Sequence, residues 1–457
     1  MLYLLQCNIF TVHSIQNPVN PRQTAIEILL KAIEQVNPAH LINQSVSMTG
    51  NLLKINEIII DISPIKNIFV IGFGKASAAM ATSLEQILQS RLTGGHIITK
   101  YGHSVPLKRI GVTEAGHPIP DQAGVAATAI ISSIADSADK DDLVICLISG
   151  GGSALLTDIP DGCSLDDLIK LNDSLLKAGT DIKELNTVRK HLSAVKGGWL
   201  AKRAFPARIV SLILSDVTGD PPDVIASGPT VADTTTYSDA VSIIKRSCLE
   251  SQVPSRIFNI LESGASGQRQ ETPKADDPVF GNTSNIIIGN NKMALEAAAR
   301  AALSMGYDCK IITDQLTGNV TEVSSALFGE VMQIRNKPLK QKSCLLYGGE
   351  TTVKVTADNG MGGRNQHLAL LFAKLLNNIP GVTFLSAGTD GTDGPTDAAG
   401  SVSDAATAKN AEMLKINIDD YIKRFDSYNF FKQEGGLIKT GPTLTNVMDI
   451  IVVLIDE

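Results

Sequence analysis

Residues 347–400 read YGGETTVKVTADNGMGGRNQHLALLFAKLL, a short bridge, and then TFLSAGTDGTDGPTDAAG. Two apolar runs, residues 343–347 and 382–387, each end in glycine followed by an acidic residue. Between them, residues 360–365 (GMGGRN) open a long apolar helix pattern. Glycines at strand ends let backbone amides approach a ligand, and a helix N-terminus attracts an anion. An arginine and carboxylates beside such loops suit phosphate and a hard metal ion. The stretch therefore predicts half of a phosphoryl-transfer site.

The length and composition indicate a soluble globular protein of two domains. The 457 residues exceed the usual size of a single core. A formal net charge of -7 and an aromatic content of 4% exclude the basic and aromatic surfaces typical of nucleic-acid binding. The first apolar stretch, residues 1–10, is too short to span a membrane and has no basic residue before it, so residues 1–20 are expected to be a disordered extension. The six cysteines lack C-x-x-C pairing, which favours the reducing cytoplasm.

A first cationic candidate follows the strand pattern at residues 67–71. The chain continues as Gly-Phe-Gly-Lys-Ala-Ser, so Gly74 and Lys75 stand on a turn before the helix predicted at residues 78–88. The motif does not complete a dinucleotide fingerprint, because Ser77 occupies the place of its third glycine. The next strand also ends in a lysine and not in a ribose-binding acid. Lys75 is predicted to face a ligand, the alternative being a solvated side chain.

The clearest central strand is predicted at residues 142–148, a continuous apolar run. Three consecutive glycines after a buried strand are costly in backbone entropy, and an anion-binding nest would justify them. The alternative is a tight turn. The candidate residues of this loop are Ser149, Gly150, Gly151, Gly152 and Ser153.

Further charged candidates lie downstream. Arg189 and Lys196 accompany the helix pattern at residues 181–193 and are predicted to line the ligand site, or else to form a basic, solvated helix end. Asp216 and Asp220 follow the strand predicted at residues 209–214; each is a metal or base candidate or a turn-capping residue, and Asp216 is favoured because it is closer to the strand end.

Strands alternate with helices on both sides of a polar, proline-broken segment, which predicts two open α/β domains. We expect a larger Rossmann-like domain at residues 21–262, a linker at 263–280 and a second α/β domain at 281–457. Ligands of such sheets bind beyond the carboxyl ends of the strands, and nearly every glycine-rich or acidic segment falls there. The active site is accordingly expected in the cleft between the domains.

At these same segments the chain resembles the class II glycerate 2-kinases, whose C-terminal part is called the MOFRL domain. The matching motifs are GFGKAS (72–77), GHPIPD (116–121), SGGGSALL (149–156), LNTVRKHLSAVKGG (185–198), SDVTGDPPDVIASGPT (215–230), YGGETTV (347–353), GGRNQHLAL (362–370) and AGTDGTDGPTDAAG (387–400). The resemblance implies ATP-dependent phosphorylation of D-glycerate at its 2-hydroxyl, with a divalent metal such as Mg²⁺. It also implies that Lys75 and Arg364 are the catalytic cations.

The residues then receive the following expected roles. The metal candidates are the acids Asp216, Glu350, Asp390 and Asp393. The nucleotide- or substrate-binding candidates are Gly74, the loop from Ser149 to Ser153, Arg189, Lys196, Gly349 and Asn365. An alternative for Arg364 is that it caps neighbouring structure or pairs with an acid such as Glu350.

Two rival functions stay open at this point. Relatives have carried the label hydroxypyruvate reductase, an NAD(P)H-dependent oxidoreductase; the incomplete fingerprint at Ser77 argues against it. A non-catalytic nucleotide- or sugar-acid-binding protein ranks last, because clustered acids beside Arg364 are costly without a metal and substrate. The expected partners are small molecules, with neither nucleic acid nor membrane; the sequence leaves the oligomeric state open, a homodimer included.

Overall fold

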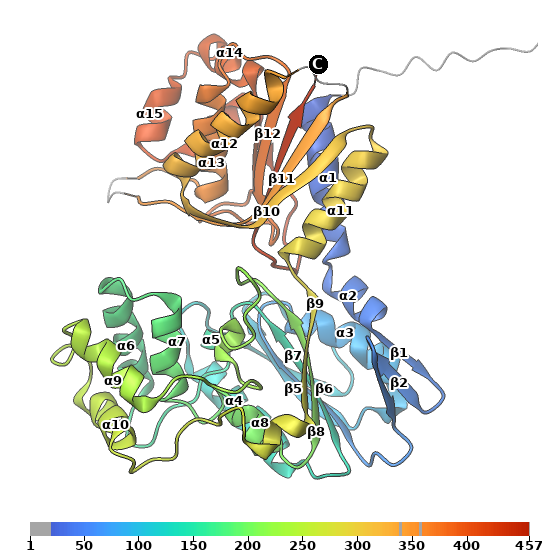
Figure 1. Cartoon of the computed structure of the whole chain (residues 1–457), viewed down its shortest axis with the longest axis vertical. Helices are drawn as coiled ribbons and strands as arrows, with labels where there is room; N and C mark the ends of the chain where they lie inside the picture. The colour runs from blue at the N-terminus through green and yellow to red at the C-terminus, as the bar shows by residue number, and fades with distance from the viewer. Residues whose placement is uncertain (1–19, 338–340, 356–358, 457) are drawn as a thin grey trace, which may run out of the picture.

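A computed structural model describes residues 20–337, 341–355 and 359–456 of the chain. The expected N-terminal extension therefore lies outside the described residues, apart from Asn20. The chain forms two α/β domains, drawn as a lower and an upper lobe in Figure 1. The prediction of two open α/β sheets is confirmed.

The N-terminal domain is built on a six-stranded, wholly parallel sheet. Its strand order is β6-β5-β4-β7-β8-β9, which is the 3-2-1-4-5-6 order of doubly wound nucleotide-binding sheets. The order reverses between β4 and β7, so the loops after these two strands flank the topological switch point. The strands are β4 (Ile68–Phe73), β5 (Gly94–Lys100), β6 (Ile110–Ala115), β7 (Leu143–Ser149), β8 (Arg208–Leu214) and β9 (Thr283–Gly289).

Helices and a small meander complete this domain. Five of its α-helices begin with a side chain that caps the first turn: Asn37, Asp121, Ser164, Asp181 and Thr236. The helical elements are α2 (Pro38–Ser45), α3 (Ser77–Leu88), η1 (Gln89–Arg91), α4 (Gln122–Ser137), α5 (Gly152–Leu155), α6 (Leu165–Lys177), α7 (Ile182–Lys190), α8 (Trp199–Ala204), η2 (Ile225–Ser227), α9 (Tyr237–Arg246), α10 (Ser255–Ala265) and η3 (Pro278–Asn282). The antiparallel meander is β1 (Val46–Thr49), β2 (Leu52–Ile55) and β3 (Ile58–Asp61).

The C-terminal domain has a mixed six-stranded sheet of order β10-β11-β15-β12-β13-β14. The last strand of the chain, β15, runs antiparallel between β11 and β12. Its strands are β10 (Asp308–Asn319), β11 (Ser343–Thr352), β12 (Val382–Gly388), β13 (Gly400–Asp404), β14 (Leu437–Ile438) and β15 (Asp449–Ile455). Its helices are α11 (Asn291–Ser304), α12 (Val320–Arg335), α13 (Arg364–Leu375), α14 (Ala405–Met413), α15 (Ile418–Lys423) and α16 (Ser427–Glu434).

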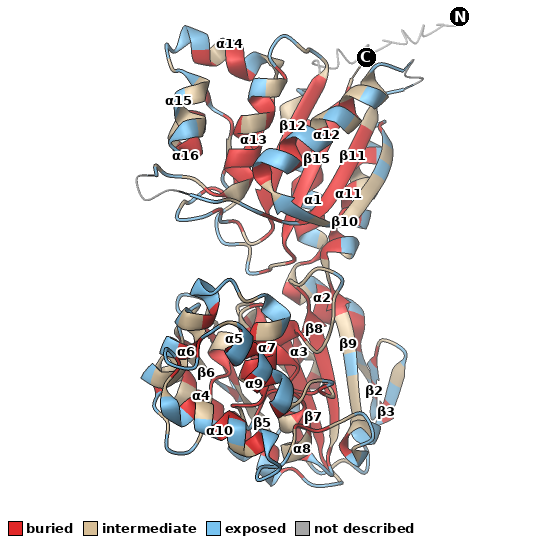
Figure 2. Ribbon diagram, turned by 60° about the vertical axis from the view of Figure 1, so that its left-hand side comes forward, coloured by how far each residue is buried: buried red, intermediate tan, exposed pale blue. Residues whose placement is uncertain are grey.

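Burial is deepest in the central strands. Every residue of β7, β12 and β15 is buried, and these strands appear as red bands in Figure 2. Strands covered on both faces require continuous apolar sequence, which explains why their runs could be recognised from the sequence. None of the helices in the described ranges is long and apolar enough to cross a membrane.

The structure corrects the predicted domain boundaries. Strand β9 lies within residues 281–457 of the sequence but completes the N-terminal sheet by pairing with β8. Helix α1 (Pro21–Gln35) packs instead on α11 and the C-terminal sheet, as Figure 1 shows. The predicted linker is also partly built into the N-terminal domain, since the buried Thr272 donates a hydrogen bond to Asp233 at 3.0 Å.

Arg22 fixes α1 to the C-terminal domain. Its guanidinium donates to both carboxylate oxygens of Asp404 at 2.8 Å and to Glu434 at 3.0 Å. The side chain of Glu434 is fully buried in this contact. Because burial strips these charges of water, the partners left behind by a truncation of Arg22 would be costly.

We expect Arg22→Ala to destabilise the C-terminal domain by about 3 kcal/mol. The matched control is Lys31→Ala on the same helix, whose exposed pair with Glu34 contributes about 0.5 kcal/mol or less. Chemical denaturation followed by circular dichroism measures the loss, while fluorescence of the single tryptophan, Trp199, reports on the N-terminal domain separately. A midpoint for Arg22→Ala equal to that of the control would contradict the anchoring role.

Candidate active site

The N-terminal half of the site stands at the switch point between β4 and β7. The amide of Lys75 donates to the carbonyl of Gly150 at 2.9 Å, and the amide of Ala76 donates to Ser149 Oγ at 3.0 Å. The loop containing Gly74 and Lys75 is thereby fastened to the loop of three glycines. Within the described chain the ammonium of Lys75 makes no ion pair, so its charge remains available to an anion.

Asp216 lies directly against the three-glycine loop. A Cβ atom added to Gly150 would stand 1.9 Å from Asp216 Oδ2, so only glycine fits beneath this carboxylate. From the C-terminal domain, Asn446 Nδ2 donates to the same oxygen at 3.2 Å. Burial is the main cause of a raised pKa at Asp216, and the charge of Lys75 opposes it. The carboxylate therefore joins loops of both domains.

The C-terminal half is organised by Arg364, the first residue of α13. Its Nε and one terminal nitrogen donate to Asp449 at 2.6 and 3.0 Å, and the other terminal nitrogen lies 2.8 Å from Glu350. Burial works against the guanidinium charge, but the hydrogen bonds and charge of Asp449 outweigh it and raise the pKa of Arg364. The alternative that Arg364 pairs with Glu350 is thus observed, and a third of its side chain, 33%, remains exposed.

The two halves of the site face one another, since Asn446 of the C-terminal domain reaches Asp216 of the N-terminal domain. Burial raises the pKa of Glu350, and this carboxyl also senses Arg364 and Asp449 of its own domain. The charges of Asp216 and Lys75 in the N-terminal domain also influence the pKa of Glu350. Asp390, which follows β12, in turn contributes to the raised pKa of Asp216. We call the set Lys75, Asp216, Glu350, Arg364, Asp390 and Asp449 the interdomain cluster.

The structure assigns different work to two predicted ligand-binding residues. Asp393 accepts the backbone N–H groups of Asn365 and Gln366 at 3.1 and 2.8 Å and so caps α13 from outside the helix. Asn365 is buried, and its side-chain oxygen accepts from Ser386 at 2.6 Å. The helix N-terminus that was expected to receive an external anion is therefore closed by Asp393. Burial raises the pKa of this carboxyl to about 6.

Gly349 likewise has a structural reason for being glycine. Its φ is +139°, a conformation that residues with a side chain rarely adopt. A Cβ atom at this position would also lie 2.2 Å from the backbone of Leu316 on β10, so there is no room for a side chain. A ligand-binding role of this residue stays a prediction.

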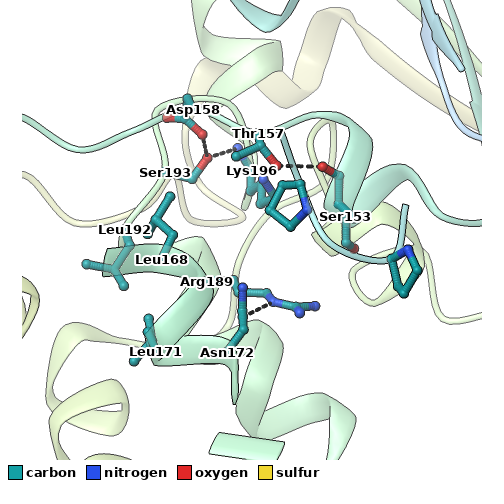
Figure 3. A pocket seen from close by; sticks show the side chains of 13 residues that line it. Ser153, Thr157, Asp158, Leu168, Leu171, Asn172, Arg189, Leu192, Ser193 and Lys196 are labelled. Atoms are coloured by element: carbon teal, nitrogen blue, oxygen red, sulfur yellow. Dashed lines mark hydrogen bonds between the residues drawn. The ribbon is translucent and has the colours of Figure 1, made fainter. Parts of the chain in front are cut away.

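Arg189 and Lys196 come together in a pocket of the N-terminal domain that Ser153 also lines (Figure 3). Arg189 Nε donates to Asn172 Oδ1 at 2.9 Å, and the ammonium of Lys196 donates to the carbonyl of Leu156. Burial lowers the pKa of Arg189 to about 10 and that of Lys196 to about 8. Lys196 is thus buried in the domain, and Arg189 is half-buried at the pocket with its Nε held by Asn172.

The candidates drawn from the sequence include neither Asp449 nor His117. Asp449 begins β15, and only an antiparallel strand brings its amino end beside the carboxyl ends of β11 and β12. The ring of His117 lies 2.8 Å from a hypothetical Cβ on Gly151, next to Lys75. Burial, aided by the charge of Lys75, lowers the pKa of His117 to about 4, so its imidazole is neutral near pH 7. The sequence signal that could have identified His117 is its position between Gly116 and Pro118 in a rigid turn.

The donor set of the interdomain cluster suits a hard cation in kind. Its carboxylates offer oxygen ligands, and the half-buried Asp216 accepts one amide hydrogen bond, from Asn446. Among the described residues no group of three His, Cys, Asp or Glu side chains is close enough to form a ready-made metal cage. Magnesium bound with a nucleotide needs only one or two carboxylates, because phosphates and waters supply the rest. The residues fit that mode of binding.

Family comparisons match the two halves of the site separately. Residues 24–262 match the model of a domain of unknown function, DUF4147, and residues 343–449 match the MOFRL family. The first match contains Lys75, Asp216, Arg189 and Lys196, and the second contains all C-terminal members of the interdomain cluster. The fold and site therefore define a two-domain α/β protein with a DUF4147 half and a MOFRL half.

Full-length relatives are similar to the whole chain. It is 40% identical to D-glycerate 2-kinase of Thermotoga maritima, over 96% of this chain and 99% of the relative. It is also 40% identical to a putative hydroxypyruvate reductase of Agrobacterium vitis, over 96% of this chain and 95% of that protein. The crystal structure of glycerate kinase from T. maritima superimposes with a TM-score of 0.84 at 39% identity, over 95% of this chain and 99% of that one. The chain belongs to the class II glycerate 2-kinase family, whose C-terminal part is the MOFRL domain.

We expect Arg364→Lys to lower kcat on the order of 10³-fold while KM changes less, because an ammonium cannot reproduce the planar fork held by Asp449 and Glu350. The matched control is Lys374→Met near the other end of α13, where an exposed pair with Asp419 is lost. Steady-state kinetics and a melting curve on each variant provide the test. A lowered melting temperature with an unchanged kcat would reduce Arg364 to a structural tie between β11 and β15.

Proposed function

We propose that this chain is an ATP-dependent kinase that phosphorylates the 2-hydroxyl of D-glycerate. The observation that carries the proposal is the interdomain cluster: Asn446 joins the two domains at Asp216, close to Lys75, and Arg364 is held by Asp449 and Glu350 on the C-terminal side. The near-complete coverage of a D-glycerate 2-kinase at 40% identity supports the choice of substrate.

Phosphoryl transfer requires positioning of the two reactants and neutralisation of the charge on the moving group. Lys75 brings a cation without a counter-ion partner from the described N-terminal domain, and Arg364 brings a guanidinium with a third of its side chain exposed. Both would contact the phosphates of ATP. Asp449 positions Arg364 by engaging two of its nitrogens.

Asp216, Glu350 and Asp390 would hold Mg²⁺ with the nucleotide. When bound, the ion neutralises phosphate charge and orients the transferred group. His117 offers a neutral imidazole beside Lys75 that can accept a hydrogen bond from the acceptor hydroxyl. In this proposal Asp393 and Asn365 only maintain the shape of the loop.

Hydroxypyruvate reduction is the weaker candidate, although a relative bears that name. Ser77, at the place of the third fingerprint glycine, is buried and donates to the carbonyls of Gly74 and Ile98 at 2.7 and 3.2 Å. Strand β5 ends in Lys100, where a ribose-binding acid would be needed.

We also propose a cytoplasmic location and small-molecule partners. The cysteines that the structure describes beyond the first segment are all free, which suits a reducing compartment.

A coupled assay for ADP release, run beside an assay for NADH and NADPH oxidation with hydroxypyruvate, tests the function. We expect ADP release with D-glycerate and no oxidation of either nicotinamide nucleotide. Exhaustive chelation is expected to abolish ADP release and added Mg²⁺ to restore it, because the available ligands are all oxygen. Hydroxypyruvate-dependent oxidation without ADP release would overturn the proposal; full turnover after chelation would overturn its metal requirement.

Lys75→Met is expected to fold normally and to lose nearly all turnover, because methionine keeps the length of the stem and removes the charge. Lys66→Met is the matched control: Lys66 lies before the other end of β4 and makes an exposed pair with Asp141. Thermal melting and ADP release measured on the same preparations decide the matter. Near-normal rates of ADP release for Lys75→Met would show that this lysine is solvated and has no role in catalysis.

A further inference from the structure

A pocket between α5, α6 and α7 holds two cations that the mechanism above does not use. It encloses about 490 Å³, part of it open to solvent, and lies wholly within the N-terminal domain. Figure 3 shows Arg189 reaching from α7 into this space, with Lys196 and Ser153 on its other side. Leu168 and Leu171 of α6 form an apolar wall.

Neither cation forms an ion pair with a carboxylate among the described residues. Arg189 donates only its Nε, to Asn172, so its two terminal amino groups have no acceptor among the described residues. Lys196 is 5% exposed, and its ammonium has one neutral acceptor, the carbonyl of Leu156. The nearest carboxylate, Asp158, is already engaged by Ser193 Oγ and the amide of Ala194.

Lys196 is a buried charge and Arg189 a half-buried one, and neither has an ion-pair partner among the described residues. Such an arrangement costs free energy, and burial lowers the pKa of both groups. A bound anion would remove that cost. The pocket is thus suited in chemistry to an oxyanion, which Arg189 could hold with its two terminal nitrogens and Lys196 with its ammonium.

Two reactants of the proposed kinase carry anionic groups. The phosphates of ATP are accompanied by a divalent cation and therefore need carboxylates nearby, and the free carboxylates lie in the interdomain cluster. The pocket has two cations and only the engaged Asp158. We infer that this pocket binds the carboxylate of the acceptor, a small 2-hydroxy acid, through Arg189 and Lys196; the inference rests on the proposed function.

The position of the pocket suits the reaction. Ser153 lines it and belongs to the loop of Gly151, against which the side chains of His117 and Lys75 pack. Pro118, the neighbour of His117, also lines it. In a 2-hydroxy acid the reacting hydroxyl is on the carbon next to the carboxylate. An acid anchored by Arg189 would therefore present its hydroxyl on the side of the pocket where the Lys75 loop stands.

Calorimetric titration of D-glycerate without nucleotide, together with KM values for both substrates, tests the inference. Lys196→Met and Arg189→Gln are each expected to weaken glycerate binding by about 10- to 100-fold, the range for losing a charge-assisted hydrogen bond. The KM for ATP should change by no more than about threefold in either variant. Lys177→Gln, which removes an exposed charge of α6, is the control and should match the wild type.

The two variants also separate binding from folding. Lys196→Met replaces a buried charge that has no ion-pair partner by an apolar side chain, so we expect it to melt at or above the wild-type temperature while glycerate binding is weakened. Glycerate binding to the wild type should weaken as pH rises through about 8, where Lys196 loses its proton between Asp158 and the still charged Arg189. This pH dependence should vanish in Lys196→Met.

Three outcomes would overturn the inference. A raised KM for ATP with unchanged glycerate binding would make the pocket a phosphate site. Unchanged values for both substrates would make its cations structural. Glycerate binding that ignores pH between 7 and 9 in the wild type would remove Lys196 from the site. Failure of the proposed function looks different, because the wild type would then bind D-glycerate, lactate or glycolate in a manner dependent on Arg189 but release no ADP.

Discussion

Arg364 ties the amino end of β15 to the carboxyl end of β11 through Asp449 and Glu350, and the C-terminal half of the site depends on this contact. Three nitrogens of one guanidinium are engaged by two carboxylates, so the side chain is fixed in one orientation. Removing one partner would leave a partly buried charge uncompensated. The network also brings two acids close together, which concentrates negative charge opposite Lys75 of the other domain.

Much of the fold could be predicted from the sequence because its central strands are covered on both faces. Continuous apolar runs such as those of β4 and β7 can be recognised as buried strands from the sequence. The glycines that follow them indicate the loops at the switch point. Lys75, Asp216 and Arg364 were accessible for the same reason, since each stands at the end of a recognisable element.

The errors arose where tertiary contacts decide. Asp449 could not be found by looking beyond carboxyl strand ends, because β15 runs antiparallel to its neighbours. Asp393 looks like a metal ligand in sequence, yet it caps α13 across a loop. Likewise, no local sequence pattern shows that α1 packs on the C-terminal sheet, although the contacts of Arg22 depend on that packing. Nor does any local pattern show that β9 completes the N-terminal sheet.

The distribution of charge gives each domain its own task. Three of the four cluster carboxylates, Glu350, Asp390 and Asp449, and Arg364 belong to the C-terminal domain. The cations of the two sites that form no ion pair among the described residues, Lys75, Arg189 and Lys196, belong to the N-terminal domain. A kinase reaction would join these sets, since Mg²⁺ and phosphate satisfy the first and the acceptor acid satisfies the second. The central claim is therefore that one reaction uses both domains. A crystal structure with Mg²⁺, a non-hydrolysable ATP analogue and D-glycerate tests it most directly. The account predicts phosphates contacted by both Lys75 and Arg364; a nucleotide whose phosphates contact only one domain would contradict it.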